Sequence, residues 1–429
     1  MLKVDGRRVR THEPVREQAR MVFEVDEDSL PKEHPARMIW DAVGLLDLSR
    51  LVVGAKSYEG SAGRDRSSPR MLLSIWVYAI SEGLGSGREI ERRLQSDVAF
   101  RWIRGQVEVG RTTLNDFRAK QGEAFDRLLT DLLGMLISEG LLSLTLVAQD
   151  GTRIRASAGS SSFRGKASLE ECLEQAKLHV KAVLASGDDP RVSERIKRAR
   201  EAAAKDFQAR VERAMQAVNE IEDHRRKSPK RSKYAAKPGK PAKRARASTT
   251  DPDARLMRMP DGGFRPGYNV QLATAGSPMG GAQTIVGVRV TNVGSDMSSI
   301  EPMLEQIENR TGLQPTVLLA DANHGDHESI EAAAAREVTL LVPAPKEKAT
   351  GEWANSAPNV LAWFERMETP EAKELMRARP VLAELPNAQL KTRLGLGQIM
   401  LRSLNKVLTV ALLAALAHNL LVHAPKLLS

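Results

Sequence analysis

The chain has 429 residues, of which 41% are hydrophobic and 28% are charged, and it carries a net charge of +10. This length predicts two or three domains with a sizeable core, and the composition is that of an ordinary globular protein. The single cysteine, Cys172, excludes an internal disulfide and a cysteine-based zinc site. Aromatic residues make up only 4% of the chain, which argues against a base-stacking platform for single strands as its main device.

The positive charge is concentrated in one segment. Residues 225–246 contain 11 Lys and Arg residues and no acid, so the rest of the chain carries about 10 − 11 = −1. Such a segment is typical of a solvated tail, and its length and lack of acids also favour contact with phosphates. A polyanion partner is therefore expected, with nucleic acid ahead of an anionic membrane.

No segment predicts a membrane protein. The N-terminus lacks the apolar core of a signal peptide. The longest apolar run, residues 407–422, is interrupted by Thr409, His418 and Asn419 and is short for a membrane span, so we interpret it as a buried helix. A cytoplasmic, nucleoid-associated protein is expected.

Residues 1–140 have the pattern of a helical N-terminal domain. The segment 71–80 is apolar almost all round, which predicts a buried helix. Another helix is predicted to open at residue 112, with Thr112 or Thr113 as its cap. Short helices with arginines on their outer faces, Arg118 among them, fit a DNA-binding helix-turn-helix arrangement, and they fit a helical scaffold with solvated arginines equally well.

A second domain is predicted over residues 141–429. It opens with a strand from 143 to 150, and a second strand is expected at 152–156. Residues 160–250 interrupt it: apolar residues at steps of three and four over 167–224 predict an antiparallel helical hairpin with a narrow coiled-coil seam, followed by the basic segment as a flexible stretch.

The pattern of strands then resumes. Strands are predicted at 267–273, 283–290, 316–321 and 338–342, with helices at 296–307 and 327–336, and the chain is expected to be helical from about residue 360. This alternation predicts a mixed α/β sheet. Asp296 is expected to cap the first of these helices.

Two carboxylates stand out because Asp150 and Asp321 each follow an apolar strand. Reactive groups collect at the carboxyl ends of strands in open α/β sheets, and a buried Asp must be paired or bound to a metal. Two such carboxylates can share hard divalent cations, although an Asp after a strand is also a common turn former. His324, Asp326 and His327 form a second candidate group, either for a transition metal or, as we prefer, as a helix-capping segment.

Several motifs resemble the insertion-sequence transposases of the DDE type. They are Asp97-Val-Ala-Phe-Arg-Trp, Thr113-Leu-Asn-Asp-Phe-Arg, Asp150-Gly-Thr-Arg-Ile-Arg, Gly267-Tyr-Asn-Val-Gln, Ala320-Asp-Ala-Asn-His and Ala417-His-Asn-Leu. Their order extends over almost the whole chain and is similar to one bacterial branch of the family with a helical N-terminal domain. The resemblance implies a ribonuclease-H-like mixed sheet with that domain in front and the helical hairpin inserted.

The resemblance also implies which residues hold Mg²⁺ or Mn²⁺. The family's two Asp fall on Asp150 and Asp321, and its Glu, seven residues before a Lys, falls on Glu384 with Lys391. Lys391 would contact a DNA phosphate. Glu374 is the fallback for the third carboxylate, because Pro386 places Glu384 at a helix start or a kink.

Two departures from the family pattern accompany these residues. Asn323-His324 replaces a common Gly-Tyr after the second Asp, and Asn tolerates the same left-handed turn almost as glycine does. Where the family commonly has an Arg four residues before the Glu, this chain has Pro380, with Arg377 and Arg379 nearby.

The function implied is that of a DNA transposase, which binds the terminal inverted repeats of an element as a homodimer and carries out metal-dependent strand cleavage and transfer into target double-stranded DNA. The alternatives are a catalytically inactive DNA-binding derivative and a metal-dependent nuclease without strand transfer. Candidate phosphate contacts are Arg118, Arg225, Arg226, Lys230, Arg231, Lys243, Arg244 and Lys391.

Overall fold

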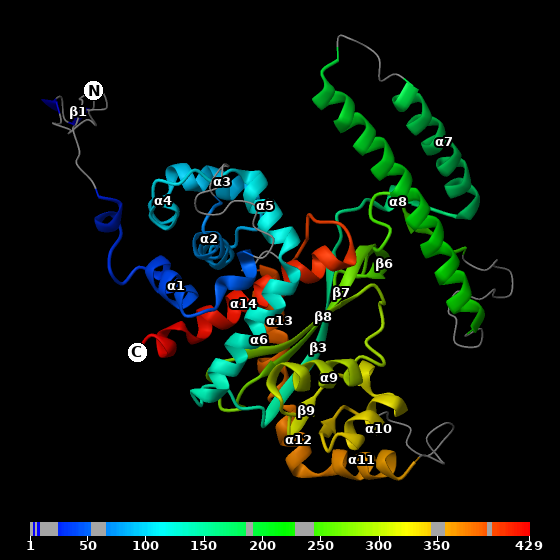
Figure 1. Cartoon of the computed structure of the whole chain (residues 1–429). Helices are drawn as coiled ribbons and strands as arrows, with labels where there is room; N and C mark the ends of the chain where they lie inside the picture. Colours follow the sequence, from blue (N-terminus) through cyan, green and yellow to red (C-terminus); the bar gives the residue numbers. More distant parts are fainter. Residues whose placement is uncertain are drawn as a thin grey trace.

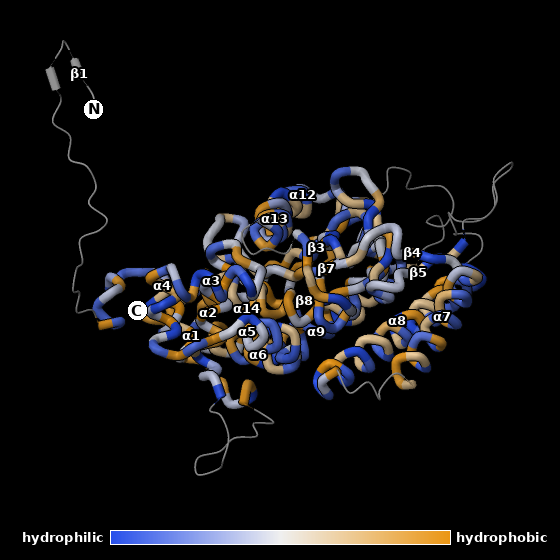
Figure 2. Tube along the Cα trace, turned by 90° about the horizontal axis from the view of Figure 1, so that it is seen from above, coloured by the Kyte–Doolittle hydropathy of each residue, from blue (hydrophilic) through white to orange (hydrophobic). Residues whose placement is uncertain are grey.

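The computed structural model describes residues 25–52, 66–185, 192–227, 244–344, 357–392 and 397–429, and the backbone of two short paired strands, β1 (Lys3–Val4) and β2 (Arg7–Arg8). A mixed sheet lies at the centre, with helices around it and one helical hairpin projecting away from it (Figure 1). Hydrophobic residues are concentrated around the sheet and the last helix, α14 (Leu404–Leu427) (Figure 2).

The sheet is built around β3 (Leu146–Arg155) and has the strand order β10-β9-β3-β7. β9 (Val317–Leu319) pairs with β3 and with β10 (Thr339–Leu341), in parallel in both cases. β7 (Phe264–Ala275) is antiparallel to β3, to β8 (Thr284–Thr291) and, through its first residues, to β6 (Arg255–Arg258). The mixed sheet and the four strands predicted between residues 267 and 342 are confirmed.

One strand prediction is wrong. The sequence suggested a strand ending at Asp150 and a separate strand at 152–156, whereas β3 continues without a break through both. The reason is that Gly151 stays extended and pairs with Gln271 on β7, so the ladder between β3 and β7 extends from Val147 to Arg155. Asp150 therefore lies within the central strand and not at its end.

The N-terminal part is helical, as predicted. Its helices are α1 (Pro35–Gly44), α2 (Pro69–Ser81), α3 (Gly87–Ser96), α4 (Val98–Arg104), α5 (Arg111–Lys120) and α6 (Gly122–Ser138), with 3-10 turns at Asp26–Ser29 and Leu48–Val52. Every residue of the segment 71–80 is buried in α2, which confirms the predicted buried helix. The predicted cap of α5 is wrong, because Gly110 is its N-cap and Thr112 and Thr113 lie inside the helix.

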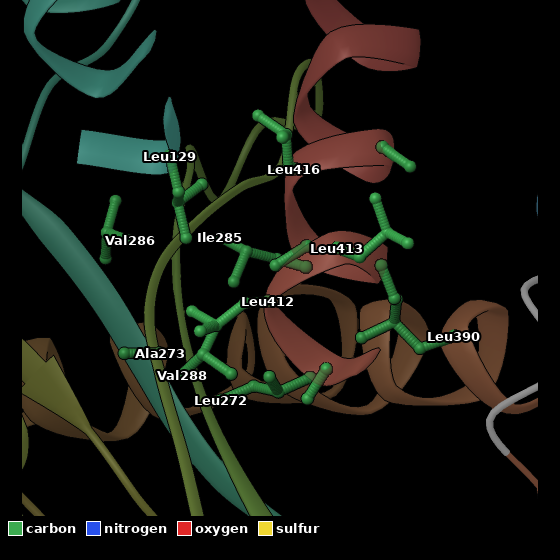
Figure 3. Close-up of a cluster of buried hydrophobic side chains, with 14 of the residues drawn as sticks. Leu129, Leu272, Ala273, Ile285, Val286, Val288, Leu390, Leu412, Leu413 and Leu416 are labelled. Atoms are coloured by element: carbon green, nitrogen blue, oxygen red, sulfur yellow. The ribbon is translucent and has the colours of Figure 1, made fainter. Parts of the chain in front are cut away.

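α14 joins the N-terminal helices to the sheet. It packs against α1, α2, α5 and α6 on one side and against β8 on the other. In Figure 3, Leu412, Leu413 and Leu416 of α14 lie among Leu129 of α6 and the side chains of β7 and β8. The helix is long and apolar enough to span a membrane, but 78% of its most apolar window is buried inside the protein. The prediction of a buried helix is therefore confirmed.

The inserted hairpin is formed by α7 (Lys166–Ala185) and α8 (Glu194–Lys227). Its base has a small core of its own, where Leu169, Val211 and Val218 pack near β5 (Ala247–Ser248), which pairs with β4 (Phe163–Arg164). The predicted seam is buried at this base and also at Ala176 and Ala204, whereas Ile196 is 48% exposed. Residues 186–191 between the two helices and residues 228–243 of the basic segment lie outside the described residues.

The remaining helices cover the other end of the sheet. They are α9 (Ile300–Thr311), α10 (His327–Ala335), α11 (Pro358–Glu368), α12 (Pro370–Met376) and α13 (Leu385–Thr392), with short helical turns at Ser160–Ser162, Ala322–His324 and Pro380–Glu384. α9 links this end to the N-terminal helices, because its buried Arg310 forms an ion pair with Asp126 of α6. The helix expected to start at Asp296 starts at Ile300.

Candidate active site

Asp150 and Asp321 come together because of strand register. β3 and β9 are parallel, and Ala148 pairs with Leu319. Asp150 and Asp321 each follow two residues later, so they lie side by side. Their charges influence one another, since the Asp321 carboxylate is one of the groups that raise the pKa of Asp150. The central strand and its neighbour thus bring the two predicted carboxylates into one site.

Asp150 is a mostly buried carboxylate whose side chain is 17% exposed. Asn387 Nδ2 donates to its Oδ2 at 3.3 Å, and its own Oδ1 accepts from the Gly151 backbone N–H at 2.9 Å. Arg379 Nη2 lies 3.6 Å from Oδ1. Burial raises the pKa of Asp150, and the Arg379 guanidinium opposes that shift.

Asp321 is held by the turn that follows β9. Its carboxylate caps the turn Ala322–His324, accepting from the Asn323 backbone N–H at 3.0 Å and from Asn323 Nδ2 at 2.9 Å. His324 Nδ1 lies 2.6 Å from Oδ1. Burial acts to raise the pKa of Asp321, but the bonds from His324 and Asn323 outweigh it, so the pKa lies below its ordinary value.

Glu384 is connected to Asp150 by Arg379, which contacts both carboxylates. Arg379 Nη1 is 3.1 Å from Glu384 Oε1, while Nη2 of the same guanidinium faces Asp150. The Glu384 side chain is 58% exposed. The fallback, Glu374, forms an ion pair with Arg377 at the surface and has a 70% exposed side chain. Of these two glutamates, Glu384 is the one linked to Asp150.

A π-helical turn accounts for the unusual spacing. Arg379 is five residues before Glu384, and the turn Pro380–Glu384 between them is π-helical, with Leu385 N–H donating to Pro380 O. A π turn closes over five residues where an α turn closes over four, so residues five apart lie on one face. Glu384 is the last residue of this turn, and α13 begins at the next residue, Leu385.

Lys391 lies in α13, two turns after Glu384 and close to Asp150. Burial lowers the pKa of its ammonium, while the Asp150 carboxylate opposes that shift. A lysine so placed is a point charge for an anionic group that approaches Asp150.

The donor chemistry of the site fits a hard cation. The carboxylates of Asp150, Asp321 and Glu384 supply the oxygen ligands that such an ion prefers. Arg379 lies between Asp150 and Glu384, and the His324 ring contacts Asp321. Within the described part of the chain, no three His, Cys, Asp or Glu side chains converge closely enough to hold one ion. Glu384 would have to leave Arg379 and turn toward the two aspartates to complete such a set.

The second candidate metal group is resolved in favour of capping. Asp326 caps α10 by accepting from the Ser329 backbone N–H at 2.9 Å, and His327 is the first residue of that helix. His324 is fully buried against Asp321. The side chains of His324 and Asp326 thus have different partners, and the predicted capping role is confirmed at Asp326.

The candidate DNA contacts lie in different environments. Arg118 is buried, and its guanidinium stacks over Trp76 and donates to Gly85 O. The sequence suggested a phosphate contact for this residue, but its side chain packs inside the N-terminal core. Arg226 is exposed beside Asp223, and Arg244 is exposed after the hairpin. Arg225 is the neighbour of Arg226 near the end of α8. Lys230, Arg231 and Lys243 lie outside the described residues.

Sequence reasoning missed the polar residues around the aspartates. Asn269 and Gln271 of β7 both donate to Asp296 Oδ1, at 2.7 and 2.5 Å, so Asp296 is not the predicted helix cap. Ser299 occupies the N-cap position of α9 instead. One signal for these residues was present, because the two amides alternate with Tyr268, Val270 and Leu272 in β7.

Two comparisons with protein families identify regions of the chain. The family described as "Transposase domain (DUF772)" matches residues 24–120, and the family described as "Transposase DDE domain" matches residues 244–420. The first covers the helices α1 to α5, and the second covers most of the sheet together with Asp321, Glu384 and Lys391. No curated protein and no solved structure gave a significant match.

Proposed function

Because the chain belongs to the insertion-sequence transposases of the DDE type, with their ribonuclease-H-like catalytic fold, we propose that it cuts DNA at the ends of an element and joins those ends to target DNA. The observation that carries this proposal is the proximity of Asp150 and Asp321: each follows by two residues the parallel pair Ala148 and Leu319 of β3 and β9, and the Asp321 carboxylate acts on the pKa of Asp150. Both carboxylates are held by fixed donors, and a cationic side chain links the first of them to Glu384.

The proposed cofactor is Mg²⁺ or Mn²⁺, held by Asp150, Asp321 and Glu384. These ions take oxygen ligands, and a pair of them stabilises both the attacking and the leaving oxygen of an in-line displacement at phosphorus. The ionised state that such binding requires is favoured at Asp321 by its donors and opposed at Asp150 by burial.

The remaining residues would position the DNA. Lys391, beside Asp150, would contact the phosphate next to the cleaved bond. The segment 225–246 would bind phosphates without reading sequence, because charge alone carries no base information. Recognition of the terminal repeats would then rest with the N-terminal helices, and two copies would act on paired ends.

One observation favours the alternative of an inactive DNA-binding derivative. Glu384 is engaged by Arg379, and the three carboxylates do not converge in the described residues. A nuclease without strand transfer is the other alternative. All three share DNA binding and differ in what happens to the strand.

The test is incubation of the full chain with a labelled element end and target DNA in Mg²⁺ or Mn²⁺. Nicking followed by joining is expected. Asp150→Asn should lower the rate at least about 1,000-fold, equivalent to about 4 kcal/mol, with DNA binding retained. The matched control is Glu374→Gln, which changes an exposed carboxylate of the same helical region and should leave the rate unchanged.

Each other outcome has a distinct meaning. Nicking without joining would replace the proposal by the nuclease, and retarded mobility without cleavage would replace it by the DNA-binding derivative. Cleavage that survives Asp150→Asn would show that the site is wrong.

A further inference from the structure

A chain of buried side chains leads from Asp296 to Asp321. It consists of Asp296, Gln271 and His324, which are 6%, 1% and 0% exposed, and we call it the buried polar chain. Gln271 Nε2 donates to Asp296 Oδ1 at 2.5 Å, and Gln271 Oε1 lies 3.3 Å from His324 Nε2. The other ring nitrogen of His324 contacts Asp321. The residues come from β7, the segment before α9 and the turn after β9, so only the folded structure connects them.

The direction of each hydrogen bond follows from Asp296. An ionised carboxylate can only accept, so the amide nitrogen of Gln271 must face it. The amide oxygen of Gln271 then faces Nε2 of His324 at 3.3 Å, while Asp321 Oδ1 faces Nδ1 at 2.6 Å, so the ring is held between two acceptors. Gln149 reinforces this orientation, because its Nε2 lies 3.4 Å from the same oxygen and is itself anchored 3.0 Å from Ser299 Oγ.

The ring orientation in turn fixes Asp321. With Nε2 committed to Gln271, the Nδ1 edge of His324 faces Asp321 Oδ1 at 2.6 Å. Asn323 holds both oxygens of the same carboxylate. Asp321 is thereby held in one orientation beside Asp150, and a buried histidine that lost its Gln271 acceptor would gain freedom to turn.

The same group of side chains packs against the strand that carries Asp150. A Cβ atom placed on Gly151 would overlap Asp296 Oδ1 and Gln271 Nε2. Glycine at this position therefore makes room for the buried polar chain directly next to Asp150. A carboxylate is costly to bury unless it is hydrogen-bonded, and Asp296 meets this condition through the amide of Gln271, the residue that also contacts His324.

We propose that Gln271 and Asp296 are positioning residues that act through His324 to hold Asp321 ready to bind a metal ion. The inference rests on the proposed function, since it assigns these residues to the metal site proposed there. Side chains that orient a metal-binding residue typically change metal affinity 10- to 100-fold when they are replaced.

The strand offers a matched pair of variants for the test. Gln271→Met keeps the length of the side chain and removes its link to His324. Asn269→Leu keeps the shape of a side chain two residues away, which also donates to Asp296 but is not hydrogen-bonded to His324. Both changes remove one donor to the same carboxylate, so a general loss of packing would affect them alike.

The measurement is the affinity of the full chain for Mn²⁺ in the absence of DNA, monitored by electron paramagnetic resonance. Gln271→Met is expected to raise the Kd for Mn²⁺ about 10- to 100-fold, while Asn269→Leu stays near the wild-type value. In cleavage assays the apparent KM for Mn²⁺ should rise with Gln271→Met, while kcat at saturating Mn²⁺ changes little. Asp296→Asn, which keeps size and polarity, should weaken Mn²⁺ binding as well, because an amide at 296 lets Gln271 turn over, and this variant decides the question if Gln271→Met does not fold.

Two results would overturn different claims. Wild-type protein that binds no Mn²⁺ would overturn the proposed function. Wild-type binding that Gln271→Met and Asp296→Asn leave unchanged, or that Asn269→Leu weakens equally, would overturn the positioning role alone.

Discussion

Arg379 is the side chain on which the electrostatics of the site depend most directly. Its guanidinium faces both Asp150 and Glu384, and its side chain is only 16% exposed. It lowers the pKa of Asp150 against the larger effect of burial. The two aspartates are thus biased in opposite directions, with the pKa of Asp150 raised and the pKa of Asp321 lowered.

This difference predicts how metal binding responds to acid. A carboxyl group binds a metal only when it is ionised, so binding is lost as the pH falls through the higher of the two pKa values, which belongs to Asp150. Arg379→Gln removes the guanidinium that lowers this pKa and leaves the burial in place. The midpoint of the acid-side loss of Mn²⁺ binding should therefore move to higher pH.

A titration of Mn²⁺ affinity against pH checks this expectation. Arg377→Gln is the control, because Arg377 is paired with Glu374 at the surface. A midpoint that stays in place or moves to lower pH in Arg379→Gln would contradict the assignment of the acid limb to Asp150.

At the scale of elements, the π-helical turn explains how a departure in sequence leaves the site intact. The spacing of five between Arg379 and Glu384 breaks the pattern expected for an α-helix, and Pro380 lies where an arginine was expected. The π turn returns the two side chains to one face, where they are 3.1 Å apart. The local sequence hides this compensation, because it depends on backbone geometry.

The contact between α14 and β8 is the second element of note. The fully buried Asn419 accepts from the Ile285 backbone N–H and donates to the Ile285 carbonyl, both at 2.8 Å. An amide side chain of the last helix thus satisfies a backbone position of β8 as a neighbouring strand would.

We expect Asn419→Leu to destabilise the protein by about 2–4 kcal/mol, because it leaves both backbone groups of Ile285 unpaired in the core. Urea unfolding of the two proteins measures this loss. Asn405→Leu, at an exposed position of the same helix, should have little effect. Equal stability of Asn419→Leu and the wild type would show that these backbone groups find other partners.

At the scale of the whole molecule, the positive charge is concentrated in a stretch of sequence that contains none of the proposed catalytic residues. The segment 225–246 contributes +11 to a net charge of +10, and it follows α8 of the hairpin. The sheet and the N-terminal helices instead share one continuous core through α14. The proposed function therefore places non-specific attraction to DNA and the chemistry of the site in different parts of the chain.

Replacing the Lys and Arg residues of this segment by Gln should flatten the salt dependence of DNA binding. The logarithm of affinity falls with the logarithm of salt concentration in proportion to the phosphates contacted, with a slope of about −0.9 for each. Preference for the element end over random DNA should persist, because phosphate contacts carry no sequence information. Binding measured over a salt series on both DNAs tests this, and a changed preference with an unchanged slope would contradict it.

Much of the architecture could be predicted because it is written in local patterns. The alternation around residues 143–150, the apolar run at 316–321 and the all-round apolar segment 71–80 each correspond to an observed element. The predictions failed where a residue's partner is remote. Arg118 was assigned to a surface but stacks on Trp76, and Asp296 was assigned to a helix start but accepts from β7.

The sequence by itself determined the strands and helices, the two aspartates that follow apolar runs, and the family to which the chain is related, because side-chain periodicity and motif order are properties of the chain. Only the tertiary structure decided that Asp150 and Asp321 are level with each other, through the parallel pairing of β3 and β9. It also decided that Arg379 links Asp150 to Glu384, and that Gln271 connects Asp296 with His324. Those contacts join residues far apart along the chain, and they form only when burial forces polar side chains to find partners inside the fold.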